Sequence, residues 1–163
     1  NVVITPDGNI VNFLRYNTKG GTPEYGKAIM LDVDKNDPSA PLTFRKVVNF
    51  HGNMSKFVIR RDKVTGKYYS LVNRVTSKNV GQSNILSLVS SDDLEKWDIV
   101  MDILNYEFNG WHEDNSQVGF QYIDWIFDGL DILFLSRTAI NNAFNYHNAN
   151  HITFHKIEDY RKL

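Results

Sequence analysis

The chain has 163 residues, of which 42% are hydrophobic and 13% aromatic, and its formal net charge is −1. This length and composition predict one globular domain with a core of sheet-forming residues. The chain lacks the basic excess of nucleic-acid-binding domains, and no apolar run approaches the ~20 residues that span a bilayer. The absence of cysteine excludes disulfides, thiolate zinc sites and a thiol nucleophile. Because the chain begins at Asn1 without methionine or signal peptide, we expect a fragment or a processed product.

The first unit, residues 1–50, is predicted to open with a β-hairpin. Alternating apolar residues over 2–15 surround an Asp7-Gly8 turn, and Asp-Gly between such runs is a strong hairpin signal. Two further strands are expected after turn-forming segments, at residues 27–33 and 42–50.

The same plan recurs in the rest of the chain. Hairpins are predicted to turn at Thr65-Gly66 and at Asp128-Gly129, and each ends at an arginine. The strands that follow these hairpins are predicted at residues 84–89, 97–104 and 150–157.

The repeat predicts the fold. Arg15, Arg74 and Arg137 end the three hairpins and lie 59 and 63 residues apart. A four-stranded unit that recurs every ~40–50 residues, lengthened here by loops, is typical of β-propeller blades. The sequence therefore predicts an all-β propeller with about three four-stranded blades, at about 1–50, 51–110 and 111–163. Propellers have typically 4–8 blades, so we expect half of a six-bladed parent. A β-sandwich of about seven to nine strands also fits the length.

Residues 90–97, SSDDLEKW, have the form S-x-D-x-x-x-x-W between a third and a fourth strand. Ser90 is expected to fix the start of this turn, and Asp92 to accept hydrogen bonds from its amides. Trp97 is expected to pack between blades. The segment resembles the Asp-box turn of sialidase-like propellers, although Leu94 replaces the usual turn glycine. Similar turns occur in five-bladed arabinanase-like glycosidase propellers, so the motif indicates a carbohydrate-active propeller without choosing between the types.

The last third of the chain carries a longer resemblance. GFQYIDWIFDGLDILFLSRTA (119–139) and HNANHITFHKIEDYR (147–161) are similar to a group of sialidase-like proteins from polysaccharide-degrading bacteria. The resemblance implies a glycoside hydrolase that acts on glycans and is secreted or periplasmic. Two residues depart from the group, because Asn148 and Leu130 stand where it usually has aspartates.

The hairpin ends predict a substrate site on one rim of the propeller. Arg15, Arg74 and Arg137 fall at equivalent strand ends and should converge, as the resemblance implies for three arginines that hold a sugar carboxylate. Alternatively, these arginines form salt bridges between blades or bond to carbonyls. Three histidines are also expected to bind substrate at this rim: His51, His112 and His147.

Catalysis at the rim needs carboxylates or a tyrosine. Most glycosidases use two carboxyl groups, for which Glu113, Asp114 and Asp124 are the candidates. Sialidases use a tyrosine nucleophile assisted by a glutamate, which makes Tyr122 a further candidate. Strand alternation should place Tyr122 and Asp124 on one face, opposite to Trp125. Alternatively, Asp124 is a buried acid that binds backbone amides, and the carboxylates at 113 and 114 lie in a solvated loop.

His147, His151 and His155 are spaced by four, which on a helix would indicate a metal site. We predict a strand over 150–157 instead, and therefore expect neither a metal site nor another cofactor. Alternation within that strand is expected to point two apolar side chains toward the core, Ile152 and Phe154.

The expected partner is a glycan, and we expect no nucleic acid and no membrane span. The remainder of the propeller or a second copy would cover the open sheet edges. Two alternatives to a sialidase-like hydrolase stay open. One is a five-bladed arabinanase-like glycosidase or phosphorylase, which would place three carboxylates at the channel. The other is a non-catalytic glycan-binding propeller.

Overall fold

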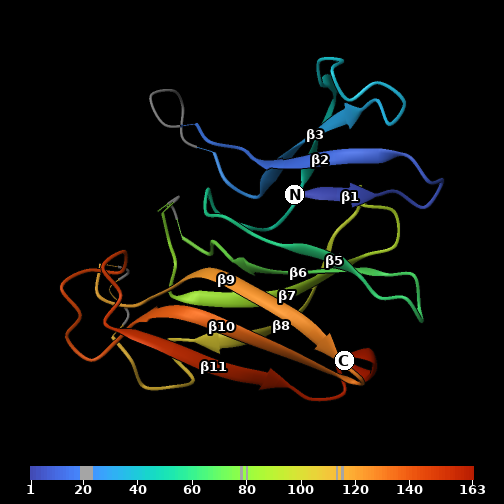
Figure 1. The fold of residues 1–163 in the computed structure, drawn as a ribbon. Helices are drawn as coiled ribbons and strands as arrows, with labels where there is room; N and C mark the ends of the chain where they lie inside the picture. The colour runs from blue at the N-terminus through green and yellow to red at the C-terminus, as the bar shows by residue number, and fades with distance from the viewer. Residues whose placement is uncertain (19–23, 78, 80, 113, 115) are drawn as a thin grey trace.

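The computed structural model describes residues 1–18, 24–77, 79, 81–112, 114 and 116–163. These residues form three antiparallel sheets and one short 3-10 helix, η1 (Tyr160–Lys162), so the predicted all-β class is confirmed (Figure 1). None of the three sheets closes on itself. Within the described residues, no helix is long and apolar enough to cross a membrane.

Each sheet is a meander whose strands follow one another along the chain (Figure 1). The first sheet contains β1 (Val2–Ile4), β2 (Ile10–Arg15), β3 (Lys27–Val33) and β4 (Thr43–Asn49). The second contains β5 (Ile59–Arg61), β6 (Tyr68–Asn73), β7 (Ile85–Ser91) and β8 (Asp98–Asn105). The third contains β9 (Gly119–Asp128), β10 (Asp131–Ala139) and β11 (His151–Ile157). The predicted hairpins and strands are present, and the third sheet contains the three strands predicted there, so the third of the expected blades lacks a fourth strand.

A left-handed glycine lies in the turn of each hairpin. Gly8, Gly66 and Gly129 have φ angles of 85°, 79° and 62°, in a region that residues with a Cβ atom rarely adopt. In the second turn, Asp62 Oδ1 also accepts a hydrogen bond from the Val64 amide at 3.0 Å. The three hairpins therefore depend on local chemistry, which is why the sequence pattern predicts them.

The second sheet is packed between the other two (Figure 1). All six residues of β6 are buried, so both faces of this strand are covered. One core, which includes Phe13 and Trp97, joins the first and second sheets. A second core, which includes Leu71 and Phe134, joins the second and third sheets. Trp97 lies edge-on to Phe13 with 6.4 Å between ring centroids, so it packs between two sheets as predicted.

The first and third sheets each leave one face without a neighbour among the described residues. The outer face of the first sheet carries five apolar side chains that are 37% to 72% exposed: Val2, Ile4, Leu14, Phe44 and Val47. The outer face of the third sheet carries four that are 50% to 69% exposed: Ile126, Leu135, Ile152 and Phe154. Both terminal sheets therefore present an apolar face to solvent.

The orientation of β11 corrects one prediction. Ile152 and Phe154 point to the outer face, not to the core. His155 lies on the inner side instead, stacked on Phe134 with 4.8 Å between ring centroids. The register of the sheet explains this, because His155 pairs with Phe134 and Phe154 pairs with the exposed Leu135.

The turn between β7 and β8 has the predicted chemistry, displaced by one residue. Ser91 Oγ accepts a hydrogen bond from a turn amide at 2.8 Å, and Asp93 Oδ1 accepts two, both at 2.8 Å. These roles were predicted for Ser90 and Asp92, but the Asp92 side chain is 77% exposed. The displacement arises because β7 continues to Ser91. Leu94 occupies a left-handed position with φ 68°, as a turn glycine would.

Candidate functional site

A pocket with a volume of about 210 Å³ lies where segments of all three sheets meet. Its lining comes from the end of β2, the segment before β5, the loop before β7, the first half of β9 and the loop before β11. The charged, aromatic and polar side chains that line it are Arg15, Lys56, His147, Tyr122, Tyr146, Asn53, Ser55, Ser83 and Gln121. No aspartate or glutamate of the described residues lines this pocket, so its charged side chains are basic.

A β-bulge in β9 places Tyr122 in the pocket. Across the ladder, Gln121 pairs with Arg137 and Asp124 with Leu135, so the two residues between them on β9 face one residue on β10. Tyr122 is the first of the two and has φ 52°, a left-handed conformation that is strained for a residue with a side chain. Its side chain is 41% exposed. The bulge therefore directs a large polar aromatic ring toward the pocket.

Two cations lie near the Tyr122 ring. Arg137 Cζ is 5.1 Å and Lys56 Nζ is 5.4 Å from the ring centroid, both within cation–π distance. The Tyr122 hydroxyl lies 3.4 Å from His147 Nε2. Arg137 Nη2 also donates a hydrogen bond to the His147 carbonyl at 3.0 Å. The arginine thus joins the strand to the loop before β11.

Arg15 approaches from the first sheet. Its side chain is exposed, and its Nη1 lies 3.5 Å from the Met54 carbonyl on the pocket wall. Four of the predicted site residues are therefore near one another: Arg15, Tyr122, Arg137 and His147.

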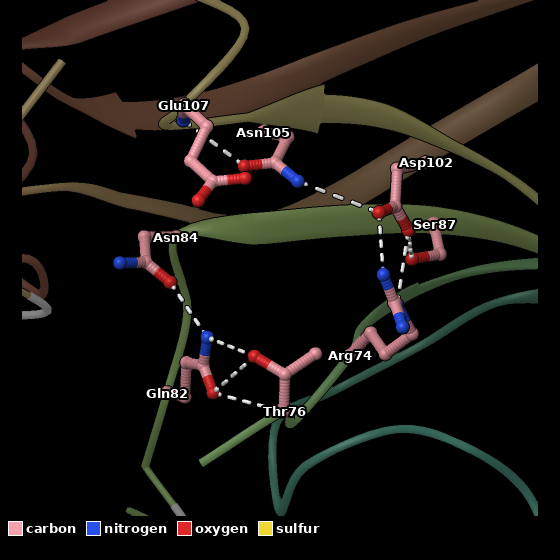
Figure 2. Close-up of polar contacts among 8 residues, drawn as sticks. All are labelled: Arg74, Thr76, Gln82, Asn84, Ser87, Asp102, Asn105 and Glu107. Atoms are coloured by element: carbon pink, nitrogen blue, oxygen red, sulfur yellow. Dashed lines mark hydrogen bonds and ion pairs between the residues drawn. The ribbon is translucent and has the colours of Figure 1, made fainter. Parts of the chain in front are cut away.

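Arg74 does not join them. Figure 2 shows its guanidinium facing Asp102, with Nε donating to Oδ1 at 3.0 Å. Ser87 Oγ donates to the same carboxylate at 2.6 Å. Burial pushes the pKa of Asp102 upward, but the hydrogen bonds from Arg74 and Ser87 outweigh it, and the net shift is downward. The predicted convergence of three arginines therefore fails at Arg74, which forms a salt bridge within the second sheet.

The lower part of Figure 2 shows how the loop before β7 is held. Gln82 Oε1 accepts a hydrogen bond from the Thr76 amide at 2.9 Å, and Gln82 Nε2 donates to Asn84 Oδ1 at 3.0 Å. Gln82 is buried, so these bonds tie both ends of the loop to one side chain. Gly81 and Ser83, on either side of Gln82, line the pocket. The polar network thus positions part of the pocket wall.

Two of the three predicted carboxylates, Asp124 and Asp114, lie outside the pocket. Asp124 is on the exposed face with Tyr122, as predicted, but it pairs with Arg60 at 3.1 Å and its side chain is 75% exposed. Asp114 is exposed, and hydrogen bonding by the Ser116 amide at 2.7 Å lowers the pKa of Asp114. These two acids bridge sheets and cap a solvated loop, respectively. Glu113 lies outside the described residues.

Two predicted histidines are also elsewhere. His51 Nε2 faces the Trp97 carbonyl, and His51 has a left-handed φ of 59°. His112 Nδ1 accepts a hydrogen bond from the Asp114 amide at 2.9 Å. Within the described part of the chain, no group of three or more His, Cys, Asp or Glu could hold a metal ion.

Several pocket residues were not predicted from the sequence, chiefly Lys56, Ser83 and Gln121. Lys56 lies in MSKFVIRRD, just before β5. A cation close to the start of a strand is the sequence signal that marks it. Gln121 is 6% exposed, and its buried Oε1 has no hydrogen-bond partner among the residues that the structure describes. No sequence signal marks it, because it sits in the alternation of β9 like a core residue.

No protein-family model matches the chain, and no curated protein matches it with significant similarity. Its class is therefore defined by the structure alone. The chain is an all-β protein of three stacked antiparallel sheets with a basic, aromatic pocket at the ends of the strands.

Proposed function

We propose that this chain is part of a carbohydrate-active β-propeller and that the pocket binds an acidic sugar residue of a glycan. The observation that carries the proposal is that Arg15, Lys56 and His147 line the pocket together with Tyr122, and that no described acid lines it. Arg137 adds a further cation, 5.1 Å from the Tyr122 ring centroid.

The chemistry of this group suits a sugar carboxylate. A guanidinium binds a carboxylate with two parallel hydrogen bonds, and a lysine adds a point charge. The two tyrosine rings offer apolar faces for stacking, and the amide and hydroxyl side chains can bond to sugar hydroxyls. The pocket volume of about 210 Å³ is below the ~300–1,000 Å³ of drug-sized sites. It therefore suits one sugar residue better than an oligosaccharide.

The arrangement of the sheets supports the propeller. The first two sheets are four-stranded meanders, the middle sheet is covered on both faces, and the outer faces of the first and third sheets are apolar. Such faces would be covered by further blades in a ring of 4–8, and we propose six. The resemblance to sialidase-like proteins supports the same architecture and a secreted or periplasmic location.

Hydrolysis is the second candidate function, and Tyr122 is the observation that favours it. Its strained backbone and exposed ring suit a nucleophile better than Asp114 or Asp124, which lie outside the pocket. The Tyr122 oxygen would bond to the anomeric carbon as the bond to the leaving group breaks. His147 Nε2, 3.4 Å from the hydroxyl, would accept the phenol proton. A water molecule would protonate the leaving group, and the resulting hydroxide would bond to the anomeric carbon as the bond to the Tyr122 oxygen breaks, which releases the sugar. The His147 imidazolium would then return the proton to the Tyr122 phenolate.

Calorimetric titration with glucuronate, N-acetylneuraminate and glucose tests the binding proposal. We expect the two acidic sugars to bind and glucose to bind at least ~10-fold more weakly, because charged hydrogen bonds contribute about 1.5–3 kcal/mol. Arg137→Gln should lower the affinity for the acidic sugars by a similar factor. Arg45→Gln, which removes a cation paired with Asp32 in the first sheet, is the matched control. Equal binding of glucose and the two acids would refute the proposal.

The same variants separate binding from hydrolysis. With 4-nitrophenyl glycosides of the acidic sugars, Tyr122→Phe should abolish release of nitrophenol and change binding less than ~3-fold, since it removes only the hydroxyl. Binding without turnover in the wild-type chain would leave glycan recognition as the function.

A further inference from the structure

Gly119, the first residue of β9, lies where the loop before β11 comes close to the strand. A Cβ atom on Gly119 would lie 2.9 Å from Tyr146 Cβ, 3.2 Å from the Tyr146 carbonyl oxygen and 3.4 Å from Ser83 Cβ. Non-bonded carbon atoms pack at about 3.5–4.0 Å, so no side chain fits at this position. Gly119 does not have a positive φ. The close approach, and not the backbone conformation, therefore requires a glycine here.

This approach is tighter than that at the other glycines which the structure describes. At none of those would an added Cβ come nearer than 3.3 Å to another residue. At Gly81 the nearest atom is the end of a side chain, Asn79 Oδ1 at 3.4 Å, which can rotate aside. The two Tyr146 atoms near Gly119 are part of the backbone or attached directly to it. They can move away only if the loop itself moves.

The residues next to this contact form one side of the pocket. Tyr146 and His147 line the pocket from the loop before β11. The Tyr146 amide donates a hydrogen bond to the Ser116 carbonyl at 2.8 Å, and Arg137 Nη2 donates to the His147 carbonyl at 3.0 Å. The His147 ring lies edge-on to Tyr122, with 6.1 Å between ring centroids. A displacement of the loop would therefore move an aromatic ring and an imidazole together.

We infer that Gly119 is a positioning residue of the pocket. Its missing side chain lets the loop before β11 pack on β9, and this packing places Tyr146 and His147 against the bound sugar. The effect on the sugar rests on the proposed function, whereas the placement of the loop does not. Gly119 itself does not line the pocket. It acts on binding only through the loop, because a Cβ in this closely packed position would push the loop outward.

The variant Gly119→Ala tests the inference on the whole chain. Proton NMR should show a changed resonance of the His147 imidazole, assigned by its loss in His147→Gln, because the ring moves relative to the neighbouring tyrosine. The resonance of His155, which lies on the inner side of β11, should stay as in the wild type. Calorimetry should show glucuronate binding at least ~3-fold more weakly, since one lost hydrogen bond corresponds to about a two- to tenfold factor.

Val48→Ala is the control for a general loss of stability. Val48 is 5% exposed in β4 of the first sheet and does not line the pocket. Removing its methyl groups should lower the melting temperature. The His147 resonance should stay unchanged in this variant, and the affinity for glucuronate should stay within twofold of the wild type.

The variant Tyr146→Gly identifies the contact that matters. It removes the atom 2.9 Å from the added Cβ, so Gly119→Ala in this background should shift the His147 resonance less than half as far as in the wild type. An equal shift in both backgrounds would overturn the inference. If Gly119→Ala alone does not fold, thermal unfolding should show that the double variant does. An unfolded double variant, with Tyr146→Gly alone folded, would also overturn it.

The outcomes separate this inference from the proposal beneath it. Failure of the wild-type chain to bind glucuronate would overturn the anion site, and the NMR comparison would still decide whether Gly119 places the loop. If the wild-type chain binds glucuronate, an unchanged His147 resonance and an unchanged affinity in Gly119→Ala would overturn the role of Gly119 and keep the anion site. A shifted resonance with unchanged affinity would overturn the contribution of the loop to binding.

Discussion

Tyr122 combines a strained backbone conformation with an aromatic side chain that lies near two cations. A side-chain residue in the left-handed region costs of order 1–3 kcal/mol and persists only where its surroundings fix it. Here the buried Ile123 and Trp125 fix the strand that follows, and the pairing of Gln121 with Arg137 fixes the strand before. The extra residue of the bulge is left in the strained conformation, with its ring among the cations.

We predict that Tyr122→Gly raises the free energy of unfolding by about 1 kcal/mol while abolishing binding of acidic sugars. Glycine adopts a φ of 52° without strain, and the lost ring is 41% exposed. Urea unfolding and calorimetric titration measure the two effects. Asp124→Gly, two residues along the same strand, is the matched control and should be destabilised by about 1 kcal/mol. A loss of stability in Tyr122→Gly equal to that of the control would show that the strain is not relieved.

The site residues differ in how far the sequence could predict them. Tyr122, Arg137 and His147 lie near one another as expected, since hairpin ends and loops of one unit share an edge of the sheet. Arg74 does not, because its partner Asp102 lies two strands away on β8, and that pairing depends on sheet order and register. Such long-range pairs leave no local signal.

At the scale of elements, the turn after β7 allows a direct test of which aspartate, Asp92 or Asp93, stabilises the turn. We predict that Asp93→Ala lowers the free energy of unfolding by about 1 kcal/mol, because two backbone amides lose their acceptor. Asp92→Ala is the matched control and should leave stability nearly unchanged, since Asp92 is exposed and 3.7 Å from Lys67. Urea unfolding distinguishes the two variants. A larger loss of stability in Asp92→Ala than in Asp93→Ala would instead support the turn role that the sequence predicts for Asp92.

A side-chain ion pair joins η1 to the β5–β6 hairpin. Arg161 donates two hydrogen bonds to Asp62, both at 2.8 Å, and Asp62 is 2% exposed. These bonds hold the pKa of Asp62 well below its usual range. A carboxyl with a lowered pKa in the folded state stabilises the fold above its unfolded pKa of ~3.9, and this stabilisation is lost as pH falls toward the folded pKa.

We therefore predict that the melting temperature falls as the pH is lowered from about 5 to about 2, and that Asp62→Asn makes this dependence shallower. Asp98→Asn, which removes an exposed carboxylate in the same sheet, is the matched control and should follow the wild-type curve. Differential scanning calorimetry across this pH range measures both. Parallel curves for wild type and Asp62→Asn would mean that the link to Arg161 contributes nothing to acid stability.

The hairpins and β11 differ in how far the local sequence determines their structure. The hairpins follow from Asp-Gly and Thr-Gly turns between alternating runs, and they form as predicted. The inward face of β11 was predicted wrongly because alternation defines two faces but not which one has a neighbour. In the third sheet the neighbour lies on the side of Phe134 and His155, so the more apolar side of β11 is exposed.

At the scale of the whole molecule, the three sheets contrast in how they are covered. The middle sheet has neighbours on both faces and a fully buried β6, whereas the outer faces of the first and third sheets expose Phe44, Ile152 and Phe154 at 64% or more. Contiguous exposed apolar faces of this kind mark association surfaces in soluble proteins. In the proposed ring, each would pack on a further blade as the middle sheet packs on its neighbours.

We predict that the isolated chain self-associates through these faces, and that Phe44→Lys combined with Phe154→Lys makes it monomeric. A lysine on each face introduces a charge that is costly to bury in an apolar contact. Sedimentation velocity over a range of concentrations measures the association. Phe108→Lys is the matched control, because Phe108 is 71% exposed but lies in the loop between β8 and β9 and belongs to neither outer face, so this variant should associate like the wild type. If the wild-type chain is monomeric, or if the double variant associates as strongly, the outer faces are not packing surfaces and the case for further blades loses its structural support.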